Sequence, residues 1–278
     1  MAEAFKQSDI EILVATMNRQ SLDFLEPMFP FAHYSGYDIL VVNQTDASAL
    51  LTSPYPNVRI INAFEKGLAK SRNVALQNAK GALCLITDDD IVFEPDFANT
   101  ICNAYNDNPN AALITFRILN GSGQLYKKYP VSRQPSATAL KRLSIMSVEM
   151  VVNRKKILDS KVLFNENFGL GAQFTMGEEA IFTHELHQQK ALIVMEPVVI
   201  ARHDAVDTHA RVNIGQKYYV QGALFTAIFK NNYFIWVFLK LLYELKSGDV
   251  LIWQVPKALK AARKGCNDFN ILHEKNNR

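Results

Sequence analysis

Three consecutive aspartates, Asp88, Asp89 and Asp90, are the residues whose types and spacing point most directly to chemistry. They follow an apolar run over 82–87 that predicts a buried strand, so their carboxylates stand together at its carboxyl end. Three like charges in one turn repel each other, and a divalent cation that prefers oxygen ligands, Mg²⁺ or Mn²⁺, offsets that repulsion most simply. The pattern therefore predicts a metal-assisted reaction on a phosphate-bearing substrate. A solvated acidic turn is the alternative.

A second polar cluster precedes the aspartates, in the segment 65–73. Gly67 permits close approach of a ligand to the backbone. Lys70 and Arg72 carry charges that suit phosphate oxygens, and Asn73 has an amide that can contact a base or a ribose. Two basic residues on a helix are usually a solvated face, but the aspartates that follow favour a nucleotide site.

The elements that must position these groups follow from the hydrophobic pattern. Short apolar or β-branched runs predict strands, and segments of helix formers lie between several of them. The predicted strands cover 10–16, 38–42, 58–61, 82–87, 111–116 and 192–199, and the predicted helices cover 67–79 and 97–106. Strands that alternate with helices predict an α/β fold with a parallel sheet of nucleotide-binding geometry. The Gly-, Pro- and Tyr-rich segment 120–136 predicts an irregular excursion near the site.

Length and composition narrow the class of protein. The 278 residues suffice for one large α/β domain, or for a domain with an appendage. Cys84, Cys102 and Cys266 are odd in number and lack paired spacing, which argues against a disulfide framework and against a structural zinc site. The polar amino terminus lacks a signal-peptide pattern, and no run of about 20 apolar residues is present. We therefore expect a cytoplasmic protein.

Charge is distributed unevenly along the chain. Residues 197–278 contain 12 Lys+Arg and 6 Asp+Glu, a net charge of +6, whereas the preceding residues contain 18 and 21, a net charge of −3. Aromatic and aliphatic residues over 233–243 accompany this basicity, which predicts a helical segment at an anionic membrane surface, on the inner face of the plasma membrane, and no nucleic-acid partner. A helical lid packed by the same apolar residues is the alternative. The cations expected to meet lipid are Lys257, Lys260, Arg263 and Lys264.

The order of four motifs resembles that of family 2 glycosyltransferases with the GT-A fold. These motifs are the segments 16–19, 43–46, 67–73 and 88–90, and the resemblance covers roughly residues 8–210. It implies a GT-A catalytic domain over 1–212, with a mainly parallel sheet flanked by helices. Beyond that domain, the long helical pattern of the residues themselves predicts a helical C-terminal segment over 213–278, at a membrane surface or as a lid. The resemblance also implies a hexosyltransferase-type enzyme that transfers a sugar from a nucleoside diphosphate sugar with inversion, UDP being the default nucleotide.

The same resemblance implies roles for individual residues. Asp88 would contact the nucleotide and Asp90 would ligate Mn²⁺ or Mg²⁺, as in the family's Asp-x-Asp motif, with Asp89 as the middle residue. His203 stands where many members supply a histidine to the metal. The implied nucleotide-sugar-binding residues are Thr16, Asn18, Arg19, Asn43, Gln44, Lys70, Arg72, Asn73, Asp88 and Asp89.

The catalytic base is implied by a later segment. Residues 176–182 resemble the family's Gly-Glu-Asp segment, which opens a helix and carries the base. Glu179 stands where the family usually has Asp, and its longer side chain leaves Glu178 as the competing candidate. Read without the resemblance, two acidic residues at a helix start are an ordinary cap that suits the helix dipole.

One departure and two rival functions remain. The family commonly has Asp after its second strand, and this chain has Asn43 and Gln44, which leaves the nucleobase open. A sugar nucleotidyltransferase is one rival, but 15–19 is not the Gly-rich loop that such enzymes share. A non-catalytic sugar-binding relative is the other, although Asp88, Asp90 and Glu179 are all present. The resemblance, together with the basic C-terminal region, implies a glycan or lipid-linked acceptor in bacterial surface polysaccharide synthesis.

Overall fold

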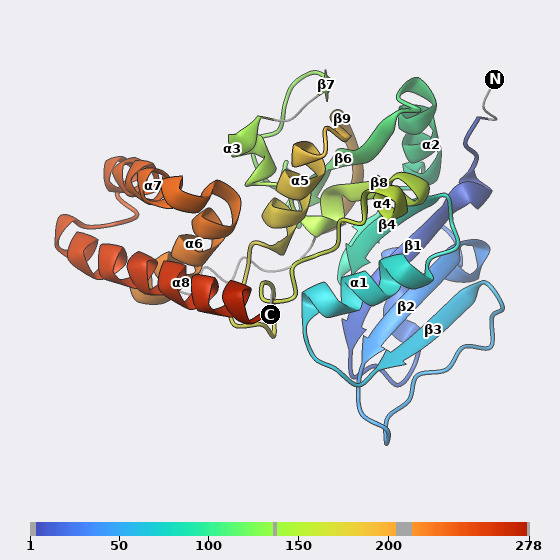
Figure 1. The fold of residues 1–278 in the computed structure, drawn as a ribbon. Helices are drawn as coiled ribbons and strands as arrows, with labels where there is room; N and C mark the ends of the chain where they lie inside the picture. Colours follow the sequence, from blue (N-terminus) through green and yellow to red (C-terminus); the bar gives the residue numbers. More distant parts are fainter. Residues whose placement is uncertain (1–3, 136–137, 204–212, 277–278) are drawn as a thin grey trace. The chain divides into compact units, whose positions relative to one another are not determined.

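The computed structural model describes residues 4–135, 138–203 and 213–276, and Figure 1 shows its elements. Nine strands of the described residues form one sheet in the order β3-β2-β1-β4-β8-β6-β9-β5, with β7 paired to β9. The strands are β1 (Ile10–Met17), β2 (Asp38–Gln44), β3 (Val58–Ala63), β4 (Leu83–Asp88), β5 (Ile91–Phe93), β6 (Ala111–Asn120), β7 (Gln134–Pro135), β8 (Met150–Asn153) and β9 (Leu192–His203).

The amino-terminal half of the sheet is parallel, as predicted. β1 pairs with β2 on one side and with β4 on the other, and β2 pairs with β3. The inner strands are buried on both faces, which explains why they read as continuous apolar runs in the sequence. Each predicted strand in this half is present, and the observed strands extend one or two residues further at their carboxyl ends.

The second half of the sheet is mixed. β6 and β9 are parallel, whereas β8 runs antiparallel between β4 and β6, and β5 and β7 run antiparallel on β9. The predicted α/β fold with a sheet flanked by helices is confirmed, with four parallel and four antiparallel pairings. The sequence pattern misses β8 because it is only four residues long.

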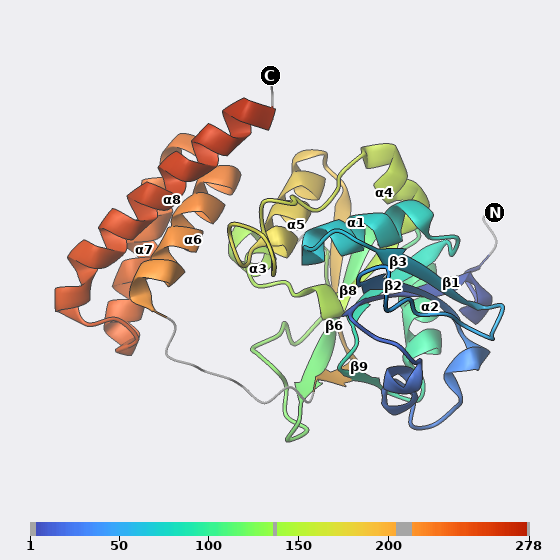
Figure 2. The ribbon, with the colours of Figure 1, turned by 90° about the horizontal axis from the view of Figure 1, so that it is seen from below.

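Helices cover both faces of the sheet (Figures 1 and 2). Alternate residues of β1 show the division, since Ile12 and Val14 pack in the cluster that contains α2, while Leu13 packs in the cluster that contains α1 and α5.

The helices are α1 (Leu68–Asn78), α2 (Phe97–Asp107), α3 (Ala139–Arg142), α4 (Arg154–Ser160), α5 (Glu178–Gln188), α6 (Ile214–Phe229), α7 (Tyr233–Ser247) and α8 (Val255–Asn276), with 3₁₀ helices η1 (Gln7–Asp9), η2 (Asp23–Met28), η3 (Tyr34–Gly36), η4 (Ser147–Glu149), η5 (Lys230–Asn232) and η6 (Ile252–Gln254).

The chain divides into two compact units. The first contains the sheet, with residues up to 166 and from 178 to the end of β9. The second contains the carboxyl-terminal helices together with the earlier segment 167–177. The predicted boundary between 212 and 213 adjoins residues 204–212, which lie outside the described residues, so that boundary stays a prediction.

The second unit is built on a close contact between α6 and α8, which run side by side in Figures 1 and 2. A Cβ at Gly222 of α6 would lie 2.0 Å from the carbonyl oxygen of Ala262, so only glycine permits this approach. Segment 167–177 joins the unit through Phe168 and Phe174, which pack on Phe269 of α8. Among the described helices, none combines the length and apolar content that crossing a bilayer requires.

Candidate active site

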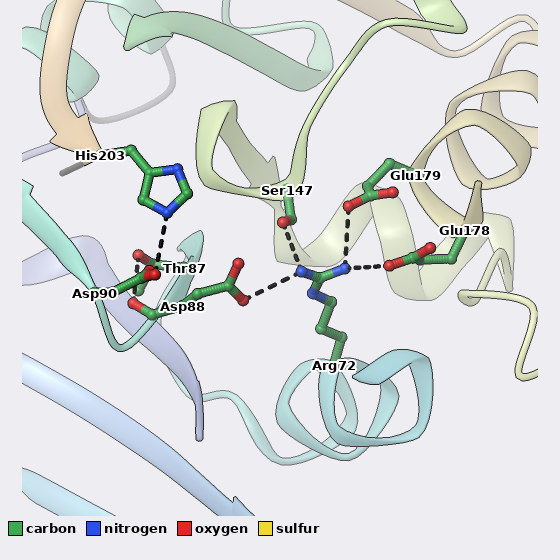
Figure 3. Close-up of polar contacts among 8 residues, drawn as sticks. All are labelled: Arg72, Thr87, Asp88, Asp90, Ser147, Glu178, Glu179 and His203. Carbon is green, nitrogen blue, oxygen red and sulfur yellow. Dashed lines mark hydrogen bonds and ion pairs between the residues drawn. The ribbon is translucent and has the colours of Figure 1, made fainter. Parts of the chain in front are cut away.

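The guanidinium of Arg72 is the centre of the site (Figure 3). Its Nη1 donates to Glu178 Oε1 at 2.9 Å and to Glu179 Oε1 at 3.2 Å. Its Nη2 donates to Asp88 Oδ1 at 3.2 Å and to Ser147 Oγ at 2.6 Å. The side chain is only 2% exposed, so one buried cation holds three carboxylates that come from two distant parts of the sequence. Burial opposes the charge on Arg72, but the three carboxylates outweigh burial and raise its pKa.

Two helix starts bring these groups together. Gly67, which precedes α1, has φ +135 and donates its N–H to Gln44 Oε1 at 2.7 Å, which ties the start of α1 to the end of β2. Arg72 then lies in the second turn of α1. Glu178 and Glu179 form the first turn of α5, where the helix dipole favours negative charge. The sequence prediction that the 176–182 segment opens a helix is confirmed.

Ser147 reaches the site because of the antiparallel strand that the sequence did not reveal. β8 pairs with β4 so that its first residues lie beside the carboxyl end of β4, and η4, which contains Ser147, immediately precedes β8. The Ser147 side chain is buried, and it satisfies part of the Arg72 guanidinium. No motif in the sequence marked this residue.

The two outer aspartates of the acidic turn occupy different electrostatic environments. Burial raises the pKa of Asp88, and the opposing effect of Arg72 does not cancel it. The hydrogen bond between His203 Nε2 and Asp90 Oδ2, at 3.1 Å, lowers the pKa of Asp90. The Asp90 side chain is 52% exposed. Asp90 therefore presents an ionised carboxylate that solvent can reach, whereas the Asp88 carboxylate is paired with Arg72.

His203 meets Asp90 because of strand register. β9 ends at His203, which pairs with Ile91 of β5, the residue directly after Asp90. The ring of Tyr126, from the predicted irregular excursion, stacks on His203 with centroids 5.7 Å apart. One residue of this excursion therefore lies beside the candidate site, as expected.

The donor chemistry of Asp90 and His203 fits a divalent cation. A carboxylate oxygen and an imidazole nitrogen are both ligands that Mn²⁺ accepts. The surrounding charge favours a cation, because Asp88, Glu178 and Glu179 share one buried guanidinium and the charge of Asp90 acts on Asp88. In the described part of the chain, no group of three or more His, Cys, Asp or Glu side chains is arranged to hold a metal ion. Two protein ligands would therefore need further oxygens from a substrate or water.

Asp89, the middle residue, ties two strands together. Its Oδ2 accepts from Thr16 Oγ1 at 2.5 Å and from Arg19 Nε and Nη2 at 2.9 and 2.7 Å. Because β1 and β4 are adjacent and parallel, the residues after each strand meet at the same edge of the sheet. Arg19 remains 43% exposed at this edge.

The residues at the end of β2 shape the same edge through the backbone. Asn43 accepts the Arg19 N–H and donates to the Arg19 carbonyl, each at 3.0 Å. Asn18 adopts φ +55, and its N–H donates to the Gln44 carbonyl at 2.9 Å. Asn43 is fully buried and Gln44 nearly so, so both side chains hold neighbouring loops in place.

Lys70 and Asn73, although close in sequence, have different surroundings. Lys70 is partly exposed, and its Nζ pairs with Glu65 at 2.5 Å. Asn73 is 4% exposed, donates to the Phe164 carbonyl at 2.9 Å and to Glu166 Oε1 at 3.1 Å, and accepts the Phe164 N–H at 2.8 Å. A direct contact between Asn73 and a nucleotide would require these bonds to break, and the contact stays a prediction.

The two candidate bases differ in access to solvent. The Glu179 side chain is 18% exposed, and that of Glu178 is 4% exposed. Burial, followed by the charge of Glu179, raises the pKa of Glu178 to about 7, against the opposing effect of Arg72. Its second oxygen, Oε2, is buried and has no hydrogen-bond partner among the residues that the structure describes. Glu179 is therefore the carboxylate that a second substrate can reach more easily.

The structure brings most of the predicted site residues to one edge of the sheet, the carboxyl ends of β1, β2 and β4. It adds three residues that sequence reasoning did not single out, which are Ser147, Tyr126 and Glu166. The aromatic content of 120–136 is the only sequence signal that pointed towards one of them, Tyr126.

Comparison with known proteins agrees with this architecture. Among solved structures, the chain is similar to residues 1–349 of TarS from S. aureus, with a TM-score of 0.58 and 15% identity over 92% of this chain and 80% of that chain. The same TarS fragment in complex with UDP-GlcNAc gives a TM-score of 0.58 and 15% identity, over 91% and 79% of the two chains. A likeness at this identity shows the GT-A type of fold.

No curated protein matches the sequence. A family model described as Glycosyl transferase family 2 matches residues 8–159, which is more than half of the chain and includes the acidic turn and the Arg72 segment. The chain therefore belongs to glycosyl transferase family 2.

Proposed function

We propose that this enzyme is a metal-dependent inverting glycosyltransferase that moves a sugar from a nucleoside diphosphate sugar to a hydroxyl group. The convergence of Asp88, Glu178 and Glu179 on one buried Arg72, beside the Asp90–His203 pair, carries this proposal. In this arrangement, a carboxylate held by Arg72 lies in the same site as the Asp90–His203 pair, which suits a metal ion bound to a diphosphate. A scaffold that only binds sugar would gain no stability from so much buried, unbalanced charge.

Glu179 is the proposed general base. Its carboxylate accepts the proton of the acceptor hydroxyl, whose oxygen attacks the anomeric carbon from the face opposite the nucleotide. The bond between the anomeric carbon and the diphosphate oxygen breaks, and the nucleoside diphosphate leaves with the electron pair. Arg72 is a positioning residue in this scheme, because its Nη1 holds Glu179 while its own charge is neutralised by carboxylates.

Asp90 and His203 are the proposed metal ligands. When bound, Mn²⁺ or Mg²⁺ would offset the negative charge of the diphosphate. Asp90 is suited to this role because it is ionised and half exposed. Tyr126, stacked on His203, restrains the orientation of the imidazole ring.

The nucleotide is proposed to bind along the carboxyl ends of β1, β2 and β4. Arg19 and Lys70 keep exposed cationic groups there, which suit phosphate oxygens. The remaining proposed binding residues act directly or by holding the adjoining loops, and they are Thr16, Asn18, Asn43, Gln44, Arg72, Asn73, Asp88 and Asp89. UDP is the proposed nucleotide, supported by the likeness to TarS, whose structures include complexes with UDP-GlcNAc and with UDP.

The proposed acceptor is a glycan or a lipid-linked sugar in the synthesis of a bacterial surface polysaccharide. The basic, aromatic carboxyl-terminal region supports this choice, because an enzyme that uses a lipid-linked acceptor works at an anionic membrane surface. We accordingly propose a cytoplasmic enzyme that binds peripherally to the inner face of the plasma membrane.

A panel of nucleotide sugars tests the donor and the metal together. We expect one UDP-sugar to raise the melting temperature and to be hydrolysed slowly in Mn²⁺ or Mg²⁺, and both effects to disappear in EDTA. Asp90→Asn should lose both effects with its fold intact, because repulsion within the acidic turn falls. Full activity in excess EDTA, or normal activity of Asp90→Asn, would show that the metal assignment is wrong. Release of inorganic diphosphate from a nucleoside triphosphate and a sugar phosphate would indicate a nucleotidyltransferase.

A further inference from the structure

Helix α7 differs from an ordinary surface helix because its outward face, like its inward face, is largely apolar. The face packed within its unit includes Val237, Leu241 and the charged residue Glu244, each at most 2% exposed. The outward face consists of large apolar side chains that are 48–67% exposed, at the spacing of one helical stripe. We call it the α7 stripe, and its residues are Phe234, Ile235, Phe238, Leu239, Leu242 and Tyr243.

Glu244 does not destabilise the packing of the inward face, because its buried carboxylate is paired with two lysines and a tyrosine hydroxyl. Its Oε1 pairs with Lys217 at 2.7 Å and with Lys240 at 3.0 Å, and its Oε2 accepts from Tyr218 at 2.9 Å. This network fixes which side of α7 faces α6. The apolar stripe is therefore held outward by a specific set of bonds, and rotation of the helix to bury it would break them.

The apolar surface continues beyond the helix. Leu251, Ile252 and Trp253, in the connection to α8, are 43%, 70% and 71% exposed. Of the 21 large apolar side chains that are exposed in the described part of the chain, nine lie between Phe234 and Trp253. Isolated exposed apolar residues are ordinary, but a contiguous group of this kind marks an interaction surface.

The charges around this surface indicate the partner. Between 230 and 264 the exposed acidic residue is Asp249, whereas six cations are exposed. A symmetric contact between two copies would bring this excess of cations together in one interface. Anionic lipid headgroups complement it, and Trp and Tyr side chains favour the boundary between headgroups and acyl chains. The six cations are Lys230, Lys246, Lys257, Lys260, Arg263 and Lys264.

We propose that the α7 stripe, with Leu251, Ile252 and Trp253, docks on an anionic phospholipid bilayer. The apolar side chains enter the headgroup region while the neighbouring cations contact lipid phosphates. The inference deepens the proposed function, on which it rests in one respect, since a lipid-linked acceptor lies in such a bilayer. Docking itself needs neither donor nor catalysis.

Co-sedimentation with vesicles tests the docking surface. Wild-type protein should sediment with phosphatidylcholine vesicles that contain about one third phosphatidylglycerol, should not sediment with phosphatidylcholine alone, and should be released by high salt. Ile252→Ser combined with Trp253→Ser should weaken binding at least tenfold, as roughly expected for two lost apolar anchors. Both side chains are mostly exposed, so the fold should persist. The matched control is Phe64→Ser with Leu140→Ser, an exposed aromatic and an exposed aliphatic side chain of the first unit, and it should bind normally.

A charge variant tests the second part of the surface. Changing Lys257, Lys260, Arg263 and Lys264 to Gln should lower binding by on the order of 100-fold or more, since each cation near an anionic surface contributes roughly fivefold. Four exposed lysines of the first unit, changed to Gln, remove the same charge and should have a much smaller effect. These are Lys80, Lys128, Lys155 and Lys161.

The outcomes separate this inference from the proposed reaction. Glu179→Gln should bind vesicles like wild type, so loss of turnover leaves docking intact. Wild-type protein that ignores anionic vesicles at low salt would overturn the inference, as would equal losses in the test and control variants. If sedimentation velocity shows a dimer that Ile252→Ser with Trp253→Ser dissociates, and no vesicle binding occurs, the surface is a contact between copies and the inference is wrong.

Discussion

Two buried charge clusters, one in each unit, use the same types of side chain with different results. In the first unit, the cation Arg72 is shared by Asp88, Glu178 and Glu179. In the second unit, the carboxylate Glu244 is shared by two lysines and a tyrosine hydroxyl. In the first cluster three carboxylates share one cation, so negative charge is in excess. In the second cluster the single carboxylate is paired with two cations and a hydroxyl, so its charge is balanced.

The pKa values of the acids follow this difference. In the first cluster, burial raises the pKa of Asp88 and brings that of Glu178 to about 7. In the second, burial would raise the pKa of Glu244, but hydrogen bonds from its lysine and tyrosine partners outweigh burial and lower it. The unbalanced cluster holds a carboxylate, Glu178, whose pKa lies near neutral pH, whereas the balanced cluster only fixes packing. We infer that the imbalance marks the site of chemistry.

The largest expected effect is on turnover. Glu179→Gln should reduce the rate by about 10²–10⁴-fold with little change in donor affinity, because a general base is removed while the shape of the site is retained. Steady-state kinetics and donor titration measure the two quantities. Glu178→Gln is the matched comparison and should keep more activity. If the Glu178 variant is inactive and the Glu179 variant active, the roles of the two glutamates are exchanged.

The next effect is on the stability of the first cluster. Arg72→Met should lower the free energy of unfolding by roughly 3–5 kcal/mol at neutral pH, because three carboxylates would lose their shared cation. Urea unfolding measures the total, and hydrogen exchange in α1 and α5 locates the loss. A variant as stable as wild type would show that the carboxylates relax into solvent without cost.

The contributions of the two clusters to the free energy of unfolding should also change with pH in opposite directions. The pKa of Glu178 is raised from 4.5 to about 7, so its contribution to stability is complete below pH 4.5 and is lost as pH rises through 7. That loss amounts to about 3 kcal/mol, and Asp88 adds to it in the same sense. Glu178→Gln should flatten the decline in unfolding free energy between pH 5 and 8. Parallel slopes for the variant and wild type would contradict the prediction.

Glu244 should show the reverse dependence, since its pKa is lowered. Its contribution is present at neutral pH and is lost as pH falls below 4.5 through the folded-state pKa. Glu244→Gln should therefore lower stability at pH 7 by only about 1–3 kcal/mol, the cost of leaving partly exposed lysines without their acid. The difference from wild type should shrink at acid pH. Hydrogen exchange in α6 and α7 measures the effect where it arises.

The sequence predicted the parts of this site that depend on local patterns. Apolar runs located β1, β2 and β4, and their parallel order explains why Thr16, Asn43 and Asp88 meet at one edge. Ser147 was missed because its position depends on β8, a four-residue strand whose pairing is set by tertiary contacts. The burial of Arg72 was missed for a related reason, since helix spacing alone does not tell which carboxylates lie opposite the residue.

Asn73 shows a second limit of sequence reasoning. An amide beside two basic residues suggests a nucleotide contact, yet its three hydrogen bonds link α1 to residues 164 and 166. Residue type indicated the hydrogen-bonding capacity correctly but not the partner. The partners lie about 90 residues away, a separation at which local pattern carries no information.

The crossing of segment 167–177 into the helical unit has a consequence for how this chain can be cut. The polypeptide leaves the sheet unit after Glu166, packs Phe168 and Phe174 among the carboxyl-terminal helices, and returns at Glu178 through Gly177, which has φ +108. A protein truncated before α6 would keep its proposed base but leave both phenylalanines without a core. Deletion of the helices would therefore do more than remove a tail, because a stop codon there would leave an apolar, unanchored loop directly before the proposed base in the sequence.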